Sequence, residues 1–299
     1  MRKTRSMKKT AGLIALCMIL VLTGCKITND TDEQPYIEQI NYSNLIDTSV
    51  QKQLAEIMNS ADISPVRQQV FFDHVNQFNN TVSSEGMAAG FEVKQVTEEK
   101  YDPYAMQEEW DAAYPDFMGY NCRITAFGLF GDHITIAADA ETREDIILMD
   151  MASLEEDSSA MQNDKDMDRF RVLYSTVPTD DTKDVSVHVE NLRSDWKNRG
   201  IVFDNNPDVS LISVVFHDAW DGENQLFIGH TGVLFQVSET ELYFVEKIAF
   251  QEPYQLTIFN NRTELNDYLM AKYDTGTGQP TAAPFIMEND ELMEGYRSK

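Results

Sequence analysis

The sequence predicts an α+β fold in which N-terminal helices pack on a C-terminal antiparallel sheet. From about residue 42 to residue 200, apolar residues recur mainly at helical spacing. After residue 208 the pattern changes to four runs of β-branched and aromatic residues, separated by short polar turns. Short connections favour antiparallel pairing of consecutive strands. The chain is 42% hydrophobic, which supplies enough apolar surface for a sizeable core.

The first 24 residues have the features of a secretory signal and are expected to leave the mature chain. Basic residues precede an apolar run from Leu13 to Leu22, which leads into Leu22-Thr23-Gly24-Cys25. This tetrapeptide resembles the lipobox of bacterial lipoproteins, which implies cleavage before Cys25 and a lipid on its thiol. The alternative is an uncleaved transmembrane anchor, but the run is shorter than the ~20 residues that span a bilayer. We therefore expect a lipid anchor in the cell membrane and a protein on its extracytoplasmic face.

Residues 25–41 are polar and are expected to form a tether, followed by a single domain over residues 42–299. The whole chain has 24 basic and 50 acidic residues, a net charge of −26. The signal holds five of the basic residues and none of the acidic ones, so the mature chain would have a net charge of −31. This charge disfavours nucleic acid as a partner, and also direct adhesion to anionic lipid.

The helical part of the domain has clear start and stop signals. Ser64-Pro65 and Asp102-Pro103 each combine a capping residue with proline at the first helical position. Gly200 ends the last of these helices, because glycine favours the left-handed backbone found there. Helices are expected around residues 50–58, 65–78, 103–110, from 122 onward, and over 146–154, 167–173 and 189–196.

Four consecutive strands are expected over residues 209–216, 226–237, 241–250 and 254–259. A helix over 263–273 follows them, and the tail to Lys299 has little regular signal.

Alternation within two of these strands places a polar residue on an apolar face. Ile228, His230, Gly232 and Leu234 are expected to point one way, and so are the residues of the next strand: Leu242, Phe244, Glu246, Ile248 and Phe250. A buried carboxylate is costly unless it is paired, and neighbouring strands bring such side chains within reach. The alternative is that each polar group faces an open edge or bonds to backbone.

Cys122 is the one cysteine left once Cys17 leaves with the signal and Cys25 takes the lipid, so no intramolecular disulfide is expected in the mature chain. At the start of an apolar helix, the thiol either packs in the core as a structural side chain or acts as a nucleophile. The helix dipole would lower its pKa, and free N–H groups would stabilise an oxyanion. With His230 as the base and Glu246 as the group that orients it, Cys122 completes the composition of a Cys-His-acid site.

Two stretches resemble the NlpC-type, papain-like cell-wall peptidases. Tyr120-Asn121-Cys122 is similar to their nucleophile motif, and Gly229-His-Thr-Gly-Val-Leu234 is similar to their histidine strand. In that family the third polar residue lies on the following strand, which is the position of Glu246. The resemblance covers about residues 114 to 250 and implies a papain-like fold and activity on cell-wall peptides.

The sequence departs from that family in two respects. Cys122 and His230 are 108 residues apart, so an insertion formed by the helices at 146–200 must be assumed. The usual Asp-Cys-Ser is replaced by Asn121-Cys122-Arg123, which leaves the substrate subclass and activity itself open.

The whole chain also resembles a family of bacterial, chiefly Firmicute, lipoproteins catalogued as domain of unknown function forty-three hundred. This resemblance implies no activity. It is carried above all by Phe-Gln-Glu-Pro-Tyr-Gln at 250–255, Asn-Arg-Thr-Glu-Leu-Asn-Asp-Tyr-Leu at 261–269 and Pro-Phe-Ile-Met-Glu-Asn-Asp-Glu-Leu at 284–292.

Three functions remain open from the sequence. The first is a surface-anchored cysteine amidase or peptidase that uses Cys122, His230 and Glu246 on cell-wall peptides or a similar amide. The second is a non-catalytic surface lipoprotein that binds a peptide, a glycan or a protein partner. The third is a transglutaminase-like acyl transferase, because that superfamily shares the Cys, His, acid order.

No metal or cofactor is expected. His-Glu-x-x-His is absent, the five histidines are dispersed, and no glycine-rich phosphate loop is present. The carboxylates at 155–168 lack the order of a calcium loop and are expected to be solvated. His217, at the end of the first strand, is the rival to His230 for the role of base.

Overall fold

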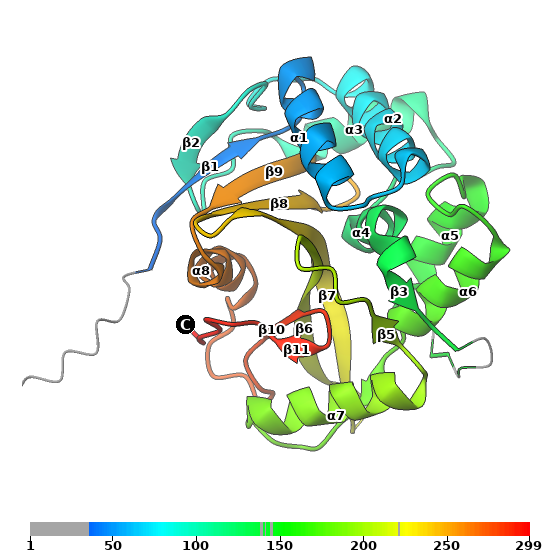
Figure 1. Ribbon diagram of the computed structural model, residues 1–299, viewed down its shortest axis with the longest axis vertical. Helices are drawn as coiled ribbons and strands as arrows, with labels where there is room; N and C mark the ends of the chain where they lie inside the picture. The colour runs from blue at the N-terminus through cyan, green and yellow to red at the C-terminus, as the bar shows by residue number, and fades with distance from the viewer. Residues whose placement is uncertain (1–35, 138–139, 141, 144–145, 221) are drawn as a thin grey trace, which may run out of the picture. The chain divides into compact units, whose positions relative to one another are not determined.

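The computed structural model describes residues 36–137, 140, 142–143, 146–220 and 222–299 (Figure 1). The expected signal over residues 1–24, Cys25 and most of the expected tether lie outside these residues. Tyr36–Lys299 forms one compact unit by itself. In the part of the chain that is described, no helix is long and apolar enough to cross a membrane.

An antiparallel sheet lies at the centre of this unit. Within the described residues it has nine strands, eight of them in the order β11-β10-β6-β7-β8-β9-β1-β2, with β4 paired to β7 beside that path. A separate pair is formed by β3 (Ile134–Thr135) and β5 (Val202–Phe203). The strands of the large sheet are β1 Gln39–Ser43, β2 Glu92–Gln95, β4 Val177–Pro178, β6 Val209–Trp220, β7 Glu223–Ser238, β8 Glu241–Lys247, β9 Tyr254–Phe259, β10 Phe285–Glu288 and β11 Glu291–Leu292.

The prediction of an α+β fold with an antiparallel sheet is confirmed, and the four expected strands are the consecutive neighbours β6 to β9. The predicted order of helices followed by sheet is only loosely met. β1 precedes the helices and begins at Gln39, inside the expected tether, and β10 forms in the tail. These strands pair with partners distant in sequence, such as Asn41 with Ile258, and each is too short for its own periodicity to reveal it.

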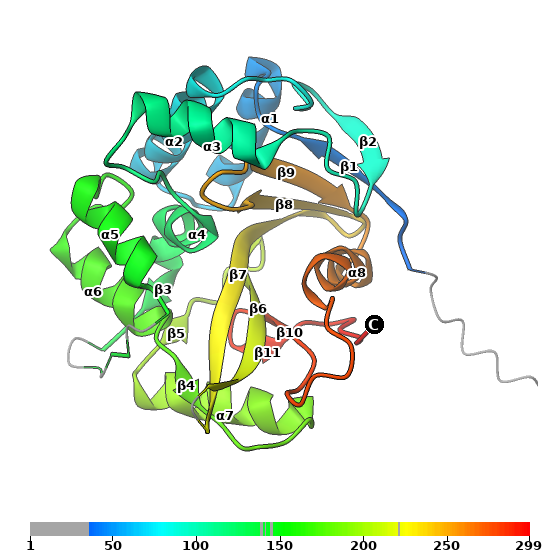
Figure 2. The ribbon, with the colours of Figure 1, turned by 180° about the vertical axis from the view of Figure 1, so that it is seen from behind.

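Helices cover both faces of the sheet (Figures 1 and 2). Val233 and Val245 belong to a core shared with α4 and the other N-terminal helices, whereas Leu234 and Phe244 belong to a second core shared with α8. The helices of the described residues are α1 Thr48–Ser60, α2 Pro65–Thr81, α3 Pro103–Ala113, α4 Cys122–Phe130, α5 Leu148–Glu156, α6 Asp164–Leu173, α7 Val185–Asn198 and α8 Arg262–Tyr273, with a 3₁₀ turn, η1, at Gly131–His133.

A bulge in β7 changes the expected alternation. The register between β6 and β7 shifts at Gly229, between the pairs Val214–His230 and Val215–Ile228. Ile228 therefore joins the core on the α4 side, while His230 stacks on Tyr273 of α8. The prediction that Ile228 and His230 share one face is wrong, because an extra residue in a strand reverses the side on which the following side chains point.

β7 and β8 part beyond the pair Val233–Val245. β8 runs on only to Lys247, three residues short of its expected end. This part of β7 has no partner in β8. β4 pairs with the edge left free, at Val177–Leu226, because β6 occupies the other edge. The start of α4 lies against the same edge, and this gap in the sheet positions the candidate site.

Candidate active site

Cys122 is the first residue of α4. The preceding residue, Asn121, has extended backbone geometry, and its side chain accepts a hydrogen bond from the backbone N–H of Ile124 at 3.0 Å. An asparagine cap of this kind satisfies one of the free N–H groups of the first turn. The helix start expected from the sequence is therefore present, and it places the thiol at the positive end of the helix dipole.

Asp150 of α5 holds both neighbours of Cys122. Its Oδ1 accepts hydrogen bonds from Nδ2 of Asn121 and from Nε of Arg123, both at 2.8 Å. Its Oδ2 accepts from Nη2 of Arg123 at 2.6 Å. Since Asp150 is fully buried, the first turn of α4 is fixed by a paired internal charge.

Two carbonyl groups on the free edge of β7 face the start of α4. The Ile228 carbonyl accepts a hydrogen bond from Nη1 of Arg123 at 3.1 Å. The Gly229 carbonyl oxygen lies 4.0 Å from Sγ of Cys122, a weak contact. The backbone groups that β8 leaves unpaired are thus met by side chains of α4.

His230 and Glu246 are a directly bonded pair. Nε2 of His230 lies 2.6 Å from Oε2 of Glu246. A carboxylate only accepts hydrogen bonds, so we assign a proton to Nε2. Cys122 and His230 lie close enough for each to shift the pKa of the other. The imidazole also stacks on Tyr273, with ring centroids 4.7 Å apart and an interplanar angle of 23°. The structure therefore brings Cys122, His230 and Glu246 together in that order.

The second oxygen of Glu246 is also satisfied. Oε1 accepts hydrogen bonds from the hydroxyl of Tyr268 at 2.5 Å and from Nε2 of Gln255 at 3.2 Å. Gln255 donates in addition to Tyr268 and to the hydroxyl of Thr257, and its Oε1 accepts from Nζ of Lys94 at 3.4 Å. The carboxylate is therefore held by groups from α8 and β9, which fixes the orientation of His230.

Cys122 and His230 favour the charged forms of each other. Burial opposes ionisation of the thiol, but the charge and hydrogen bond of His230, followed by the charge of Arg123, lower the pKa of Cys122 below its ordinary value. Burial alone would lower the pKa of His230, whereas the charge and hydrogen bond of Cys122, and then Glu246, raise it to about 9. A thiolate paired with an imidazolium is the form that these contacts stabilise.

The pKa of Glu246 is lowered in spite of its burial. Burial would raise it, but the hydrogen bond and charge of His230 act in the opposite direction, helped by Lys272 and Tyr268. The residue therefore remains a carboxylate next to the imidazolium, as a group that orients a base requires.

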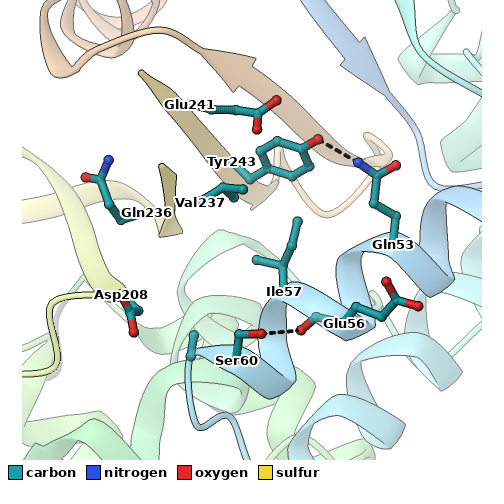
Figure 3. A pocket seen from close by; sticks show the side chains of 10 residues that line it. Gln53, Glu56, Ile57, Ser60, Asp208, Gln236, Val237, Glu241 and Tyr243 are labelled. Carbon is teal, nitrogen blue, oxygen red and sulfur yellow. Dashed lines mark hydrogen bonds between the residues drawn. The ribbon is translucent and has the colours of Figure 1, made fainter. Parts of the chain in front are cut away.

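All three residues of the candidate site are buried. Cys122 is 6% exposed, and His230 and Glu246 are each 1% exposed. None of them lines the hollow of about 420 Å³ between α1 and the ends of β7 and β8, which Figure 3 shows around Tyr243. A second hollow, of about 510 Å³ beside Tyr101, does not reach them either. The thiol therefore has little contact with solvent.

The rival base, His217, has other partners for both ring nitrogens. Its Nδ1 accepts a hydrogen bond from the backbone N–H of Ala282 at 3.0 Å, so Nε2 carries the proton and donates to Oδ1 of Asn224 at 3.0 Å. Its ring packs on His188, with centroids 4.4 Å apart. His217 therefore lies in a structural cluster. Among the residues described, no group of His, Cys, Asp and Glu side chains is arranged to hold a metal ion.

Four residues that shape the site were not identified from the sequence: Asp150, Gln255, Tyr268 and Tyr273. Asp150 interrupts the apolar run Ile146-Ile-Leu-Met-Asp-Met, and a lone acid in such a run indicates a buried, paired carboxylate. The other three come from elements whose relation to the site depends on tertiary packing. The acidic segment also differs from expectation, since Asp166 is buried and pairs with Arg67 at 2.9 Å.

A comparison with family models matches residues 41–293 to the domain of unknown function DUF4300. Comparisons with curated proteins and with solved structures gave no match. The matched segment covers most of the chain and contains all three residues of the candidate site. The chain therefore belongs to the DUF4300 family.

Proposed function

We propose that this protein is a cysteine amidase or peptidase with a papain-like arrangement of its site. The observation that carries the proposal is the buried cluster of Cys122, His230 and Glu246, in which His230 lowers the pKa of the thiol and Glu246 holds His230 by a hydrogen bond. Gln255 and Tyr268 donate hydrogen bonds to Glu246 and hold it in place, which supports a pre-organised base.

The proposed reaction is a two-step acyl transfer. The Cys122 thiolate attacks the amide carbon, and its electron pair forms the S–C bond while the carbonyl oxygen takes negative charge. As the intermediate collapses, the C–N bond breaks and the His230 imidazolium gives its proton to the departing amine. Water then attacks the thioester, His230 takes a proton from it, and the acid leaves as the thiolate is restored.

The proposed substrates are cell-wall peptides or similar amides at the cell surface. This rests on the lipoprotein signal expected over residues 1–24, before Cys25, and on the resemblance of the Cys122 and His230 motifs to NlpC-type peptidases. Where those enzymes have Asp and Ser beside the nucleophile, Asn121 and Arg123 here bind Asp150. The departure from the motif therefore serves to anchor the nucleophile, which is compatible with activity.

The test is incubation of the purified protein with fragmented peptidoglycan, followed by mass spectrometry of the products. We expect new amine and carboxyl ends that are absent with Cys122→Ala. A primary amine such as cadaverine, added in parallel, distinguishes hydrolysis from acyl transfer, because an acyl transferase would attach it to the product. Equal product patterns for the wild type and Cys122→Ala would refute the enzymatic proposal for this substrate class.

A second candidate function is a non-catalytic surface lipoprotein that binds a partner. The burial of the three side chains favours it, because a thiol that is 6% exposed is also what a structural cysteine looks like. The two proposals differ in the thiol: a structural cysteine stays protonated near neutral pH and does not form an acyl-enzyme.

A further inference from the structure

Lys94 is a buried cation on β2, the edge strand of the large sheet, and is 6% exposed. Its ammonium lies 4.2 Å from the ring centroid of Tyr42, and its Nζ donates a hydrogen bond to Oε1 of Gln255 at 3.4 Å. Within the described residues, no ion pair joins it to a carboxylate. Because a buried cation is costly without a counter-charge, Lys94 is a candidate for a role in the site.

The Gln255 side chain connects this ammonium to Glu246. Its Oε1 faces Lys94, whereas its Nε2 donates to Oε1 of Glu246 at 3.2 Å and to the Thr257 hydroxyl at 2.9 Å. A rotated amide would turn its N–H groups towards an ammonium, which only donates, and its oxygen towards a carboxylate, which only accepts. Opposite charges at its two ends therefore fix the orientation of the amide.

This orientation decides which groups donate to Glu246. As observed, the Tyr268 hydroxyl accepts from Nε2 of Gln255 at 2.8 Å and gives its own proton to Oε1 of Glu246 at 2.5 Å. A rotated Gln255 would offer its oxygen to the same proton, and Oε1 of Glu246 would lose both donors. The pKa of a buried carboxylate rises when it loses donors, so Glu246 would then stabilise the imidazolium of His230 less well.

We propose that Lys94 is a positioning residue of the candidate site, because its charge fixes Gln255 and thereby Glu246. This inference rests on the proposed acyl-transfer function and adds to it a residue from the edge of the sheet. Burial, and then the charge of Lys272, lower the pKa of Lys94 to about 8, while the charge of Glu246 acts in the opposite direction. The ammonium is therefore still charged at pH 7.

The test is the pH at which the alkylation of Cys122 by iodoacetamide inflects, in the full chain with Cys17→Ala and Cys25→Ala. Lys94→Met keeps the length of the side chain and removes its charge. We expect the inflection to move upward by about 0.5–1 pH unit, the equivalent of one lost hydrogen bond. The thermal midpoint should not fall, because an apolar side chain suits a buried position better than a cation without a counter-charge.

A double-mutant cycle tests whether Lys94 acts through Gln255. Gln255→Met alone should move the inflection upward by at least as much as Lys94→Met. If Lys94 acts on the amide, adding Lys94→Met to Gln255→Met should move the inflection no further. Additive shifts would overturn the route through Gln255, and an unmoved inflection in Lys94→Met would overturn the role itself.

The matched control is Lys100→Met, which removes a lysine charge that lies 3.8 Å from a carboxylate oxygen of Glu92. This variant should inflect as the wild type does. Lys272→Met tests a rival route, because Nζ of Lys272 lies 3.4 Å from the Tyr268 hydroxyl. A shift in Lys272→Met but not in Lys94→Met would assign the positioning role to Lys272 and overturn the inference.

Three outcomes separate the inference from the function on which it rests. If the wild type inflects at the ordinary ~8.5 and cleaves no peptidoglycan fragment beyond the Cys122→Ala background, the acyl-transfer function fails and the role of Lys94 fails with it. If the wild type inflects lower and cleaves, but Lys94→Met matches it in both, only the role of Lys94 is refuted. If Lys94→Met lowers the thermal midpoint and leaves the inflection in place, the lysine is structural.

Discussion

Arg123 and Asp150 are joined by two parallel hydrogen bonds, from Nε to Oδ1 at 2.8 Å and from Nη2 to Oδ2 at 2.6 Å. The Asp150 side chain is fully buried and that of Arg123 is 12% exposed. Such a fork-to-fork pair fixes orientation as well as charge. Arg123, the residue after the candidate nucleophile, therefore links α4 rigidly to α5.

Replacing Asp150 by Asn should destabilise the fold and loosen the site. Arg123 would keep its charge in a largely buried position without a counter-charge, which typically costs about 3–5 kcal/mol of unfolding free energy. Urea unfolding followed by circular dichroism measures the change. The control is Asp168→Asn, since Asp168 is 74% exposed and lies 3.7 Å from Arg171. The free energy of unfolding of that variant should fall by less than about 1 kcal/mol. An equal loss in both variants would show that the Arg123–Asp150 pair does not anchor the fold.

The alkylation rate of Cys122 should reveal a thiolate near neutral pH. Because the pKa of the thiol is lowered, chiefly by His230, the rate of reaction with iodoacetamide should inflect below the ordinary thiol value of ~8.5. His230→Ala should move the inflection upward, and Glu246→Gln should move it upward by less. Acyl transfer should also fall as pH rises through about 9, where His230 loses the proton that the leaving amine needs.

The control for that profile is His217→Ala, which should leave the inflection in place because both ring nitrogens of His217 bond elsewhere. A shift in His217→Ala alone would make His217 the base. A folded Cys122 that resists alkylation at every pH up to ~9 would be structural, and the binding function would then be the better account.

Removing the Tyr273 ring should speed the alkylation of Cys122. This ring, at the end of α8, stacks on His230 and covers one side of the imidazole. If Tyr273→Ala lowers the free energy of opening the site by ~1.4 kcal/mol, the rate rises about tenfold. Rates are measured at a pH where the thiol is fully ionised. Tyr273→Phe keeps the ring and should behave as the wild type; an unchanged rate in Tyr273→Ala would place the cover elsewhere.

Anchoring is tested at Cys25, which lies outside the described residues. If this residue carries the lipid, Cys25→Ala should release the protein into the medium or leave it as an uncleaved precursor. Immunoblots of membrane and medium fractions distinguish these results from normal processing. Membrane-bound protein of normal size and abundance in Cys25→Ala would contradict the lipoprotein proposal. Cys122→Ala is the control and should leave the amount of protein in each fraction unchanged.

The helix beginning at Cys122 and the strands around His230 and Glu246 were predictable because each carries its own signal. Asn121 caps the helix locally, and period-two alternation runs over several residues of β7 and β8. The bulge at Gly229 was missed, although a glycine inside a strand often marks a bulge. β1 and β10 escaped prediction because their pairing is entirely with distant segments.

By itself, the sequence determined the class of the fold, the order of the meander and the identity of three residues with the chemistry of a Cys-His-acid site. Periodicity and capping are local, so they are written in consecutive residues. Only the tertiary structure decided that Glu246 accepts from Tyr268 as well as His230, that Asp150 holds both neighbours of Cys122, and that the site is closed. Those relations join segments far apart in the chain, and their energies depend on burial and on partners that no local pattern contains.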